Sequence, residues 1–157
     1  MESRMKSPVF LLGGTREATL ALAKATQKCG LPKATLELVH ARVGQLNGCS
    51  VCVDMHTRML KRLGETDARI AVLSAWREAP YYTESERAAL ALAEAATRLA
   101  DRTDAVPDAV WKEASRHFSE EQLAALLMAI GVANLWNRLN VSTRQVTGDF
   151  VEQYLHD

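Results

Sequence analysis

The stretch that decides the fold reads Glu37-Leu-Val-His-Ala-Arg-Val-Gly-Gln-Leu-Asn-Gly-Cys49-Ser-Val-Cys52-Val-Asp-Met-His56. Apolar residues recur at helical spacing before Asn47-Gly48, and this dipeptide is a typical helix break. A second helix is expected to begin at the first cysteine. Both cysteines then lie on its first turn, and His56 lies one turn further along the same face.

This spacing supplies the groups that thiol redox chemistry needs. Two thiols on one helical turn can close a disulfide with each other, and a nearby imidazole can carry a proton. A helix N-terminus stabilises a thiolate, which favours Cys49 as the nucleophile. His56 follows Cys52 by four residues and favours that sulfur instead, through an ion pair or a proton relay. The residues alone leave both assignments open.

Glu37 lies on the preceding helix in a stripe with Ala41, Gly44 and Gly48. The small residues of this stripe allow the next helix to approach closely. A carboxylate on the same stripe can then reach His56 and fix its tautomer. The alternative is a surface glutamate that pairs with Lys33 or His40 on its own helix, since such pairs are common.

Zinc binding is the main structural alternative for the same residues. Two thiolates, one imidazole and one carboxylate make a four-coordinate donor set. Ligands crowded on one regular helix point along a single stripe, whereas tetrahedral zinc sites usually take ligands from two separated segments. The spacing therefore favours redox chemistry over zinc and over inert packing.

The remainder of the chain is also typical of helices, and its 24 alanines favour packed helices over strands. Two capping boxes, Thr83-Glu-Ser-Glu86 and Ser119-Glu-Glu-Gln122, mark helix starts. Start and stop signals predict helices over residues 15–28, 32–46, 49–64, 67–80, 83–100, 107–117 and 119–139. No stretch alternates as a strand. The expected fold class is all-α, a bundle of about seven helices.

The bulk composition bounds the class of protein. With 157 residues, the chain is expected to form a single domain over residues 1–157. Lysines plus arginines equal the acidic residues at 19 each, which argues against a nucleic-acid or anionic-membrane partner. No apolar run approaches the length of a membrane span, and residues 9–12 are too short for a signal-peptide core. A cytoplasmic location is expected. Thiols are kept reduced there, so a C-x-x-C pair is more often catalytic or metal-binding than structural.

Several other polar residues carry no motif. Cys29 is expected to be a small core residue. His40 and His117 are expected at the surface or at helix ends. Asn134 and Asn137 are expected to tie helices or subunits together, because a buried asparagine must be hydrogen-bonded.

The pattern E-x11-C-x-x-C-x-x-x-H, formed by Glu37, Cys49, Cys52 and His56, resembles the alkylhydroperoxidase D (AhpD)-like branch of the carboxymuconolactone decarboxylase superfamily. The likeness covers roughly residues 32–141. Four segments resemble family segments in the family's order: Asn47-Gly-Cys-Ser-Val-Cys-Val-Asp-Met-His56, Trp76-Arg-Glu-Ala-Pro80, Thr83-Glu-Ser-Glu-Arg-Ala-Ala89 and Asn134-Leu-Trp-Asn-Arg138.

The resemblance implies a peroxidase that uses no cofactor and no metal. Cys52 is then the peroxidatic thiol, and Cys49 is the proton donor and resolving thiol. Glu37 and His56 form the proton relay. The implied partners are a peroxide substrate and a dithiol reductant, which in the family's best-known system is a lipoylated protein. The resemblance further implies a homohexamer built from three dimers. Because tryptophan and arginine favour interfaces, the candidate contact is the last helix, with Trp136, Asn137 and Arg138.

One departure from the family pattern concerns the residue before the second cysteine. The best-studied AhpD has a histidine there, where this chain has Val51, so one helper of the relay is missing. The decarboxylase branch lacks the cysteine pair, which argues against decarboxylation. The alternatives from other classes are a non-enzymatic thiol redox sensor and a structural zinc-binding helical oligomer.

Overall fold

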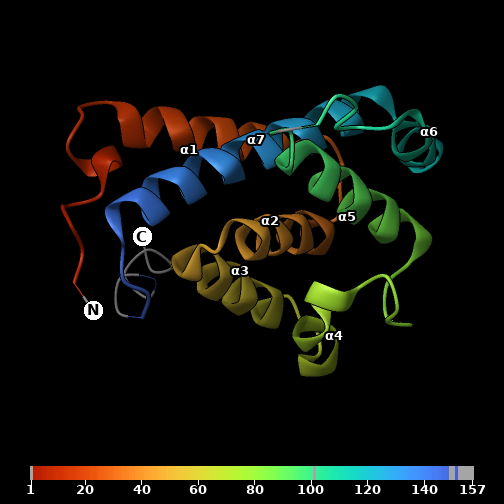
Figure 1. Ribbon diagram of the computed structural model, residues 1–157, viewed down its shortest axis with the longest axis horizontal. Coiled ribbons are helices and arrows are strands. Elements are labelled where there is room, and N and C mark those ends of the chain that lie inside the picture. Colours follow the sequence, from red (N-terminus) through yellow and green to blue (C-terminus); the bar gives the residue numbers. More distant parts are fainter. Residues whose placement is uncertain (1, 101, 149–150, 152–157) are drawn as a thin grey trace.

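The computed structural model describes residues 2–100, 102–148 and 151 (Figure 1). Within these ranges every regular element is a helix, which confirms the all-α prediction. The elements in chain order are η1 (Pro8–Phe10), α1 (Thr15–Thr26), α2 (Lys33–Asn47), α3 (Ser50–Arg62), α4 (Asp67–Ala71), η2 (Leu73–Ala75), α5 (Glu84–Thr97), α6 (Asp108–His117) and α7 (Glu120–Thr143).

Helix α2 lies at the centre of the bundle. It packs against α3, α5 and α7, while α1 runs alongside α7 on the outside (Figure 1). The segment before η1 joins the far end of α7, where the Arg4 amide donates to the Thr143 carbonyl at 2.9 Å. The two helices that carry the sequence motif are therefore an antiparallel hairpin held in the middle of the fold.

Both predicted capping boxes are present. Thr83 accepts from the Glu86 amide and the Glu86 carboxylate accepts from the Thr83 amide; Ser119 and Gln122 make the same reciprocal pair. These bonds satisfy amides at the helix start that have no partner within the helix. The sequence therefore located the starts of α5 and α7 correctly.

The largest differences from the predicted helix bounds occur in two places, while the other ends agree to within about three residues. The helix predicted over residues 67–80 is split into the short α4 and η2. The break allows Leu73 and Trp76 to enter the core, where they are 1% and 4% exposed. Helix α7 continues past the predicted residue 139 to Thr143, because Asn140 is buried against the two cysteines and the Thr143 hydroxyl bonds to the Leu139 carbonyl at 2.7 Å.

The core consists of two main clusters on opposite sides of α2. One packs α2 against α5, α6 and α7 and includes Leu36, Val39, Val43, Ala89, Leu92, Leu126 and Ile130. The other packs α2 against α3, η2 and α5 and includes Leu38, Ala41, Leu60, Leu73, Trp76, Tyr82 and Leu90. Two apolar faces on one helix explain why α2 is the hub of the bundle.

A buried carboxylate joins α2, α5 and the segment after η2. Glu94 accepts hydrogen bonds from Trp76 Nε1 at 2.9 Å, Arg42 Nε at 2.8 Å and Arg77 Nη2 at 2.8 Å. Burial acts to raise the pKa of this carboxyl, but the hydrogen bonds from Trp76, Arg42 and Arg77 outweigh it and leave the pKa below its usual value. Glu94 is therefore ionised and fully engaged.

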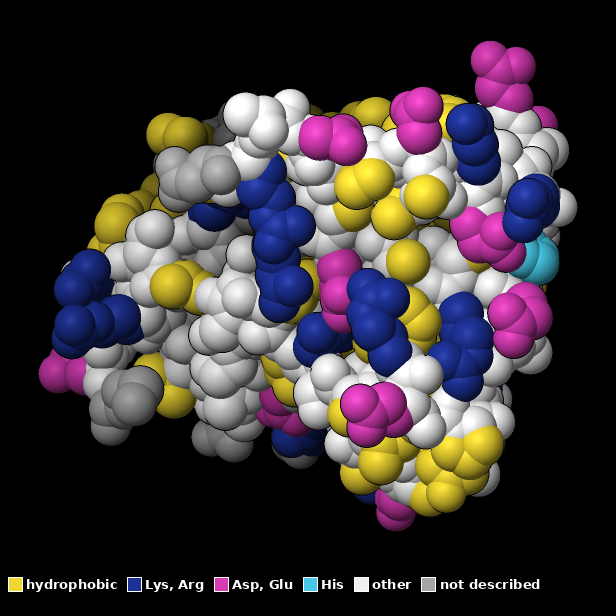
Figure 2. All heavy atoms as spheres, turned by 45° about the vertical axis from the view of Figure 1, so that its right-hand side comes forward, with side chains coloured by type: hydrophobic (Ala, Val, Ile, Leu, Met, Phe, Trp, Pro, Cys, Tyr) yellow, Lys and Arg dark blue, Asp and Glu magenta, His cyan; other side chains and the backbone are white. Residues whose placement is uncertain are grey.

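The surface carries mixed charge. On the face shown in Figure 2, acidic and basic side chains alternate with hydrophobic ones, and neither sign forms a continuous field. Of the helices in the described part of the chain, none combines the length and the apolar character that a bilayer crossing requires.

Glu94 provides a test of this packing. Glu94→Gln should lower the free energy of unfolding by about 3 kcal/mol at pH 7, because it leaves the largely buried Arg42 without its counter-charge. In the unfolded chain the Glu94 carboxylate takes up a proton near pH 4.5, whereas in the folded protein it does so only at a lower pH. The stabilisation is thus fully present above pH 4.5 and is lost as the pH falls through the lower, folded pKa. Urea unfolding from pH 7 to pH 3 should therefore give a shallower acid slope for the variant. The control Glu84→Gln changes an exposed glutamate on the same helix and should keep the wild-type curve.

Candidate active site

The turn between α2 and α3 places the two cysteines. Gly48 ends α2 with a φ of 66°, a left-handed conformation that favours glycine. Cys49 is the N-cap of α3, and its sulfur accepts from the Cys52 amide at 3.3 Å. The two sulfurs form a disulfide across a Cα–Cα distance of 5.3 Å. The bridge that the sequence spacing permits is therefore present.

Close contact between α2 and α3 occurs at Gly44. A Cβ atom added there would lie 3.3 Å from Cys52 Cβ and 3.3 Å from a Val53 methyl group. Such distances are shorter than ordinary van der Waals contacts. The prediction that the small residues of α2 admit the next helix is confirmed, and Gly44 lies against α3 at Cys52.

Glu37 and His56 meet across this contact. Glu37 Oε2 lies 2.7 Å from His56 Nδ1, and each side chain is 14% exposed. Burial acts to raise the pKa of Glu37, but the hydrogen bond to His56 and the attraction of the two nearby histidines leave it lowered. The predicted contact is therefore present, and the carboxylate holds the imidazole by one nitrogen.

His40 joins these two residues, contrary to the prediction of a surface position. Its ring lies 4.7 Å from the His56 ring, and its Nδ1 is buried without a hydrogen-bond partner among the described residues. Burial, then repulsion from His56, lowers the pKa of His40 to about 4 against the attraction of Glu37. The spacing of His40 from Glu37 along one helix was visible in the sequence, but the contact with His56 was not, because only the fold brings α3 against that turn of α2.

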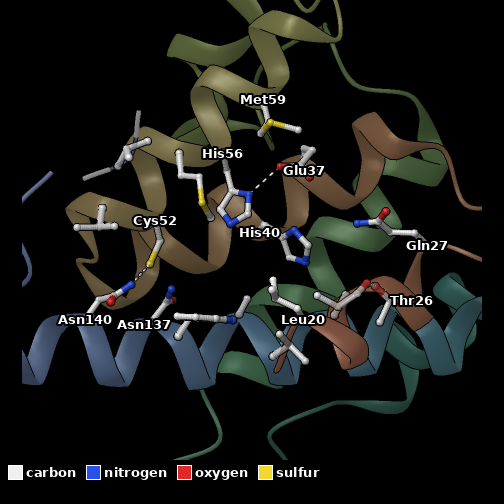
Figure 3. Close-up of a pocket in the computed structure, with 18 of the residues that line it drawn as sticks. Leu20, Thr26, Gln27, Glu37, His40, Cys52, His56, Met59, Asn137 and Asn140 are labelled. Atoms are coloured by element: carbon white, nitrogen blue, oxygen red, sulfur yellow. Dashed lines mark hydrogen bonds and ion pairs between the residues drawn. The ribbon is translucent and has the colours of Figure 1, made fainter. Parts of the chain in front are cut away.

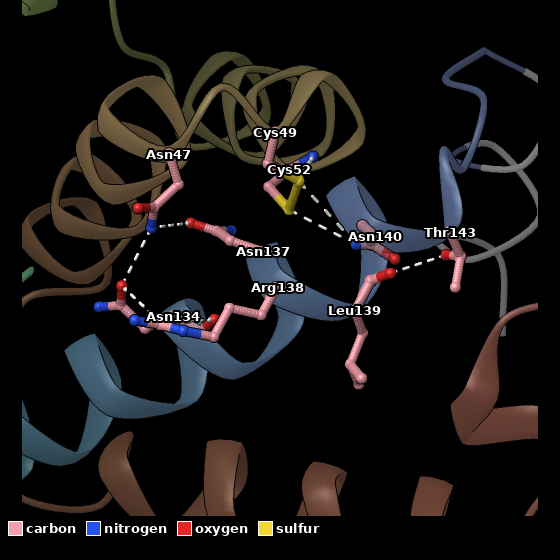
Figure 4. The surroundings of a disulfide bond; sticks show 9 residues. All are labelled: Asn47, Cys49, Cys52, Asn134, Asn137, Arg138, Leu139, Asn140 and Thr143. Carbon is pink, nitrogen blue, oxygen red and sulfur yellow. Dashed lines mark hydrogen bonds between the residues drawn. A yellow bond between two sulfur atoms is a disulfide. The ribbon is translucent and has the colours of Figure 1, made fainter.

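A row of asparagines on α7 faces the α2–α3 turn (Figure 4). Asn47 Nδ2 donates to Asn134 Oδ1 at 3.0 Å and to Asn137 Oδ1 at 2.8 Å, which confirms the predicted helix tie. Asn140 Nδ2 lies 3.5 Å from Cys52 Sγ and 4.0 Å from Cys49 Sγ. Sequence analysis missed Asn140; its spacing of three from Asn137 on the same face was the available signal.

A cavity of about 360 Å³ opens beside Cys52 (Figure 3). Glu37, His40 and His56 line it together with the cysteine. Most of the remaining lining is apolar: Leu20, Ala23, Val51, Met55, Met59, Ala129, Val132, Ala133, Trp136 and Val151. One sulfur, one carboxylate and two imidazoles therefore share a largely apolar chamber.

A second cavity, of about 260 Å³, borders the disulfide at Cys49. Cys49 lines this cavity and Cys52 lines the first, while Val51 and Asn140 line both. Arg144 and Gln145 border the second cavity from the end of α7. The disulfide is thus approached by separate spaces, each ending at a different sulfur.

Cys29 stands apart from the site. It is a free, partly buried thiol that packs against the first core cluster, and its sulfur bonds to the Thr26 carbonyl at 3.1 Å. The expectation of a small core residue is confirmed.

The profile of the carboxymuconolactone decarboxylase family matches residues 14–95, which include the α2–α3 hairpin. The chain belongs to this family. YdfG of Bacillus subtilis is 38% identical over 121 residues, covering 77% of this chain and 81% of YdfG. YnjA of Escherichia coli is 36% identical over 104 residues, covering 66% of this chain and 55% of YnjA. Both relatives are uncharacterised proteins.

Solved structures place this carboxymuconolactone decarboxylase family protein among AhpD-like folds. A protein of unknown function from Agrobacterium tumefaciens, which its crystal structure relates to the antioxidant defence protein AhpD, superposes with a TM-score of 0.86. The two are 35% identical, over 94% of this chain and 99% of the other. A peroxidase-related protein from Ralstonia eutropha with an AhpD core superposes with a TM-score of 0.74 at 19% identity, over 86% and 71% of the chains, and shows the fold alone.

Gly44 provides a test of the site's geometry. Gly44→Ala should lower the free energy of unfolding by about 1–2 kcal/mol, because the added methyl group presses on Cys52, which the disulfide holds in place. The control Gly131→Ala lies within α7 with open space around the new Cβ and should raise stability by up to about 1 kcal/mol through helix propensity. Equal stabilisation by both changes in thermal unfolding would contradict a tight contact at Gly44.

Proposed function

We propose that this protein is a thiol-dependent peroxidase of the alkyl hydroperoxide reductase type, acting in the cytoplasm. The observation that carries the proposal is the first cavity: Cys52, already bonded to Cys49, faces the same chamber as the hydrogen-bonded Glu37–His56 pair. A nucleophile, its resolving partner and a proton carrier are therefore together. Membership in a family with AhpD-like relatives supports the same reaction class.

The reaction begins with the reduced pair. His56, oriented by Glu37, takes the proton of Cys52, and the thiolate attacks the terminal oxygen of the hydroperoxide. The O–O bond breaks, the alkoxide leaves as an alcohol with a proton from Cys49, and Cys52 becomes a sulfenic acid. The Cys49 thiolate then attacks the Cys52 sulfur, water leaves, and the disulfide forms. Two thiols of a reductant restore the starting state.

The geometry favours Cys52 over Cys49 as the peroxidatic sulfur. Cys52 lines the cavity that holds Glu37 and His56, whereas Cys49 does not. Asn140 Nδ2 also lies closer to the Cys52 sulfur than to the Cys49 sulfur, and an amide donor stabilises a thiolate. These contacts outweigh the advantage that the helix N-terminus gives to Cys49.

The apolar lining favours an organic hydroperoxide over hydrogen peroxide. The free energy of an alkyl chain falls when it moves from water to a position beside apolar residues such as Leu20, Val132 and Trp136. Val51 stands where the best-studied AhpD has its additional histidine, and it belongs to the apolar cluster around the disulfide. The relay of this protein then rests on Glu37 and His56.

Substitution of each cysteine tests the function directly. Cys52→Ser should reduce peroxide consumption to the uncatalysed background. Cys49→Ser should consume about one equivalent and stop, with a sulfenic acid at Cys52 that dimedone labels, because the resolving thiol is absent. In the wild type, peroxide should remove two thiols per chain while Cys29 still reacts with an alkylating agent.

Two outcomes would overturn this assignment. Dimedone labelling of Cys49 in the Cys52→Ser variant would make Cys49 the peroxidatic sulfur. One oxidation without turnover, despite a supply of dihydrolipoamide, thioredoxin or glutathione, would favour the redox sensor.

The second cavity suits the reductant, which we propose is a dithiol such as a lipoylated protein. A thiolate attacks a disulfide in line with the S–S bond and expels the more acidic thiol. Of the two sulfurs, Cys49 lines the second cavity and Cys52 does not, so a thiolate that enters this cavity meets Cys49 and expels Cys52. The departing Cys52 thiolate then has the Asn140 amide beside it.

A trapping experiment tests this direction of attack. The oxidised protein, mixed briefly with a small monothiol and quenched with acid, should carry the adduct on Cys49, as peptide mass mapping would reveal. Val141→Trp should narrow the second cavity and slow reduction, while leaving the first oxidation of the reduced protein unchanged. An adduct on Cys52 would reverse the proposed direction.

We also propose a homo-oligomer, a hexamer of three dimers as the family likeness implies. Leu127, Met128 and Leu135 of α7 are 38–47% exposed, an apolar face that a second copy can cover. Of the three residues predicted as contacts, Asn137 is buried within the chain and Trp136 lines the first cavity, whereas Arg138 is exposed and remains a candidate contact. Light scattering after size exclusion should give a mass several times 17.3 kDa; a monomer at micromolar concentration would reject the assembly.

A further inference from the structure

Three side chains on the wall of the first cavity form a compact donor set. One ligand atom from each of Glu37, His40 and His56 can be chosen so that all lie within 4.8 Å of one another. Glu37 and His40 are three residues apart on one face of α2, and His56 projects toward them from α3 (Figure 3). The proposed peroxidase reaction uses Glu37 and His56 but gives His40 no task.

His40 has the properties of a ligand rather than of a packing residue. Its Nδ1 is buried and has no hydrogen-bond partner in the described part of the chain, whereas buried polar atoms are normally paired. With a pKa of about 4, its ring is neutral at pH 7 and keeps a lone pair for coordination. The lowered pKa of Glu37 keeps the carboxylate ionised.

We infer that Glu37, His40 and His56 form a binding site for a divalent transition-metal ion of the Zn²⁺ class. Two imidazoles and one carboxylate are a known zinc donor set, with a fourth position left for water or another ligand. Tetrahedral zinc with bonds of about 2.0–2.1 Å places its ligand atoms about 3.3 Å apart. A set of ligand atoms within 4.8 Å of one another reaches that spacing after adjustment of the side chains.

The surroundings of the donor set select the kind of ion. Imidazole nitrogens favour zinc and its neighbours over Mg²⁺ and Ca²⁺, which prefer oxygen ligands. Met55 and Met59 line the same cavity, and Arg62 brings a positive charge to it. The donor set has a single negative charge, and the positive charge of Arg62 repels a bound cation. The site should therefore bind zinc more weakly than a structural zinc site whose ligands include anionic thiolates.

Metal and proton compete for the same atoms. Coordination replaces the hydrogen bond between Glu37 and His56 and releases its proton, so that binding weakens as the pH falls. A bound ion also occupies the groups that take the proton from Cys52. The site is therefore inhibitory for a peroxidase, and it differs from a zinc site built on the two cysteines, because it remains available while they are joined in the disulfide.

The disulfide form separates this site from thiol ligation. We would titrate the oxidised Cys29→Ser protein with Zn²⁺ by calorimetry and with Co²⁺ by visible absorption at pH 7.5. The expected result is one ion per chain, with cobalt bands typical of four or five ligands and no heat from Mg²⁺. Because neither measurement needs turnover, the result stands apart from the success or failure of the proposed peroxidase.

Substitution of His40 assigns the ligand. His40→Ala and His40→Asn should each weaken zinc binding by more than about tenfold, and in a peroxidase assay should lose any zinc inhibition. The control His117→Ala changes a histidine that pairs with Glu113 on α6 and should bind zinc as the parent protein does. No binding by the oxidised parent, or equal binding by the folded His40 variants, would overturn the site.

Discussion

The close approach of α2 to α3 at Gly44 is the constraint on which the remaining features of the site depend. Without a side chain at this position, the first turn of α3 lies against α2 at Cys52. The same approach brings His56 within 2.7 Å of Glu37 and its ring within 4.7 Å of the His40 ring. Gly44 is therefore important because it has no side chain, and not because of its backbone conformation. The close approach that it allows brings the polar groups into one chamber.

The second constraint is the position of α7 across the α2–α3 turn. Asn47 holds the turn to Asn134 and Asn137, and Asn140 reaches the sulfurs from one turn further along. Asn47, Asn134 and Asn137 bond to one another, whereas the buried Oδ1 of Asn140 has no hydrogen-bond partner among the described residues. This row of amides therefore ties α7 to the turn and supplies a donor to the sulfur of Cys52.

Local signals in the sequence were sufficient for much of this architecture. The capping boxes, the Asn47-Gly48 break and the stripe of small residues before it each act through neighbours in the chain, and each predicted its element or contact correctly. The features that escaped prediction depend on distant segments. Asn140 meets a sulfur 88 residues away, and the ring of His40 meets that of His56 on another helix. The split after α4 follows from the fit of Trp76 against Glu94 on α5. Spacing along one helix carries no information on such encounters.

Burial of the two sulfurs has a consequence for selectivity. Cys49 is 1% exposed and Cys52 is 2% exposed, so among the described residues the two cavities are the routes by which a molecule can reach the pair. The size and shape of a molecule then matter more than its concentration in solution. A narrow or apolar chain can enter the cavities, whereas a bulky thiol cannot. The residues that line the cavities, rather than the sulfur atoms themselves, therefore select which molecules reach the disulfide.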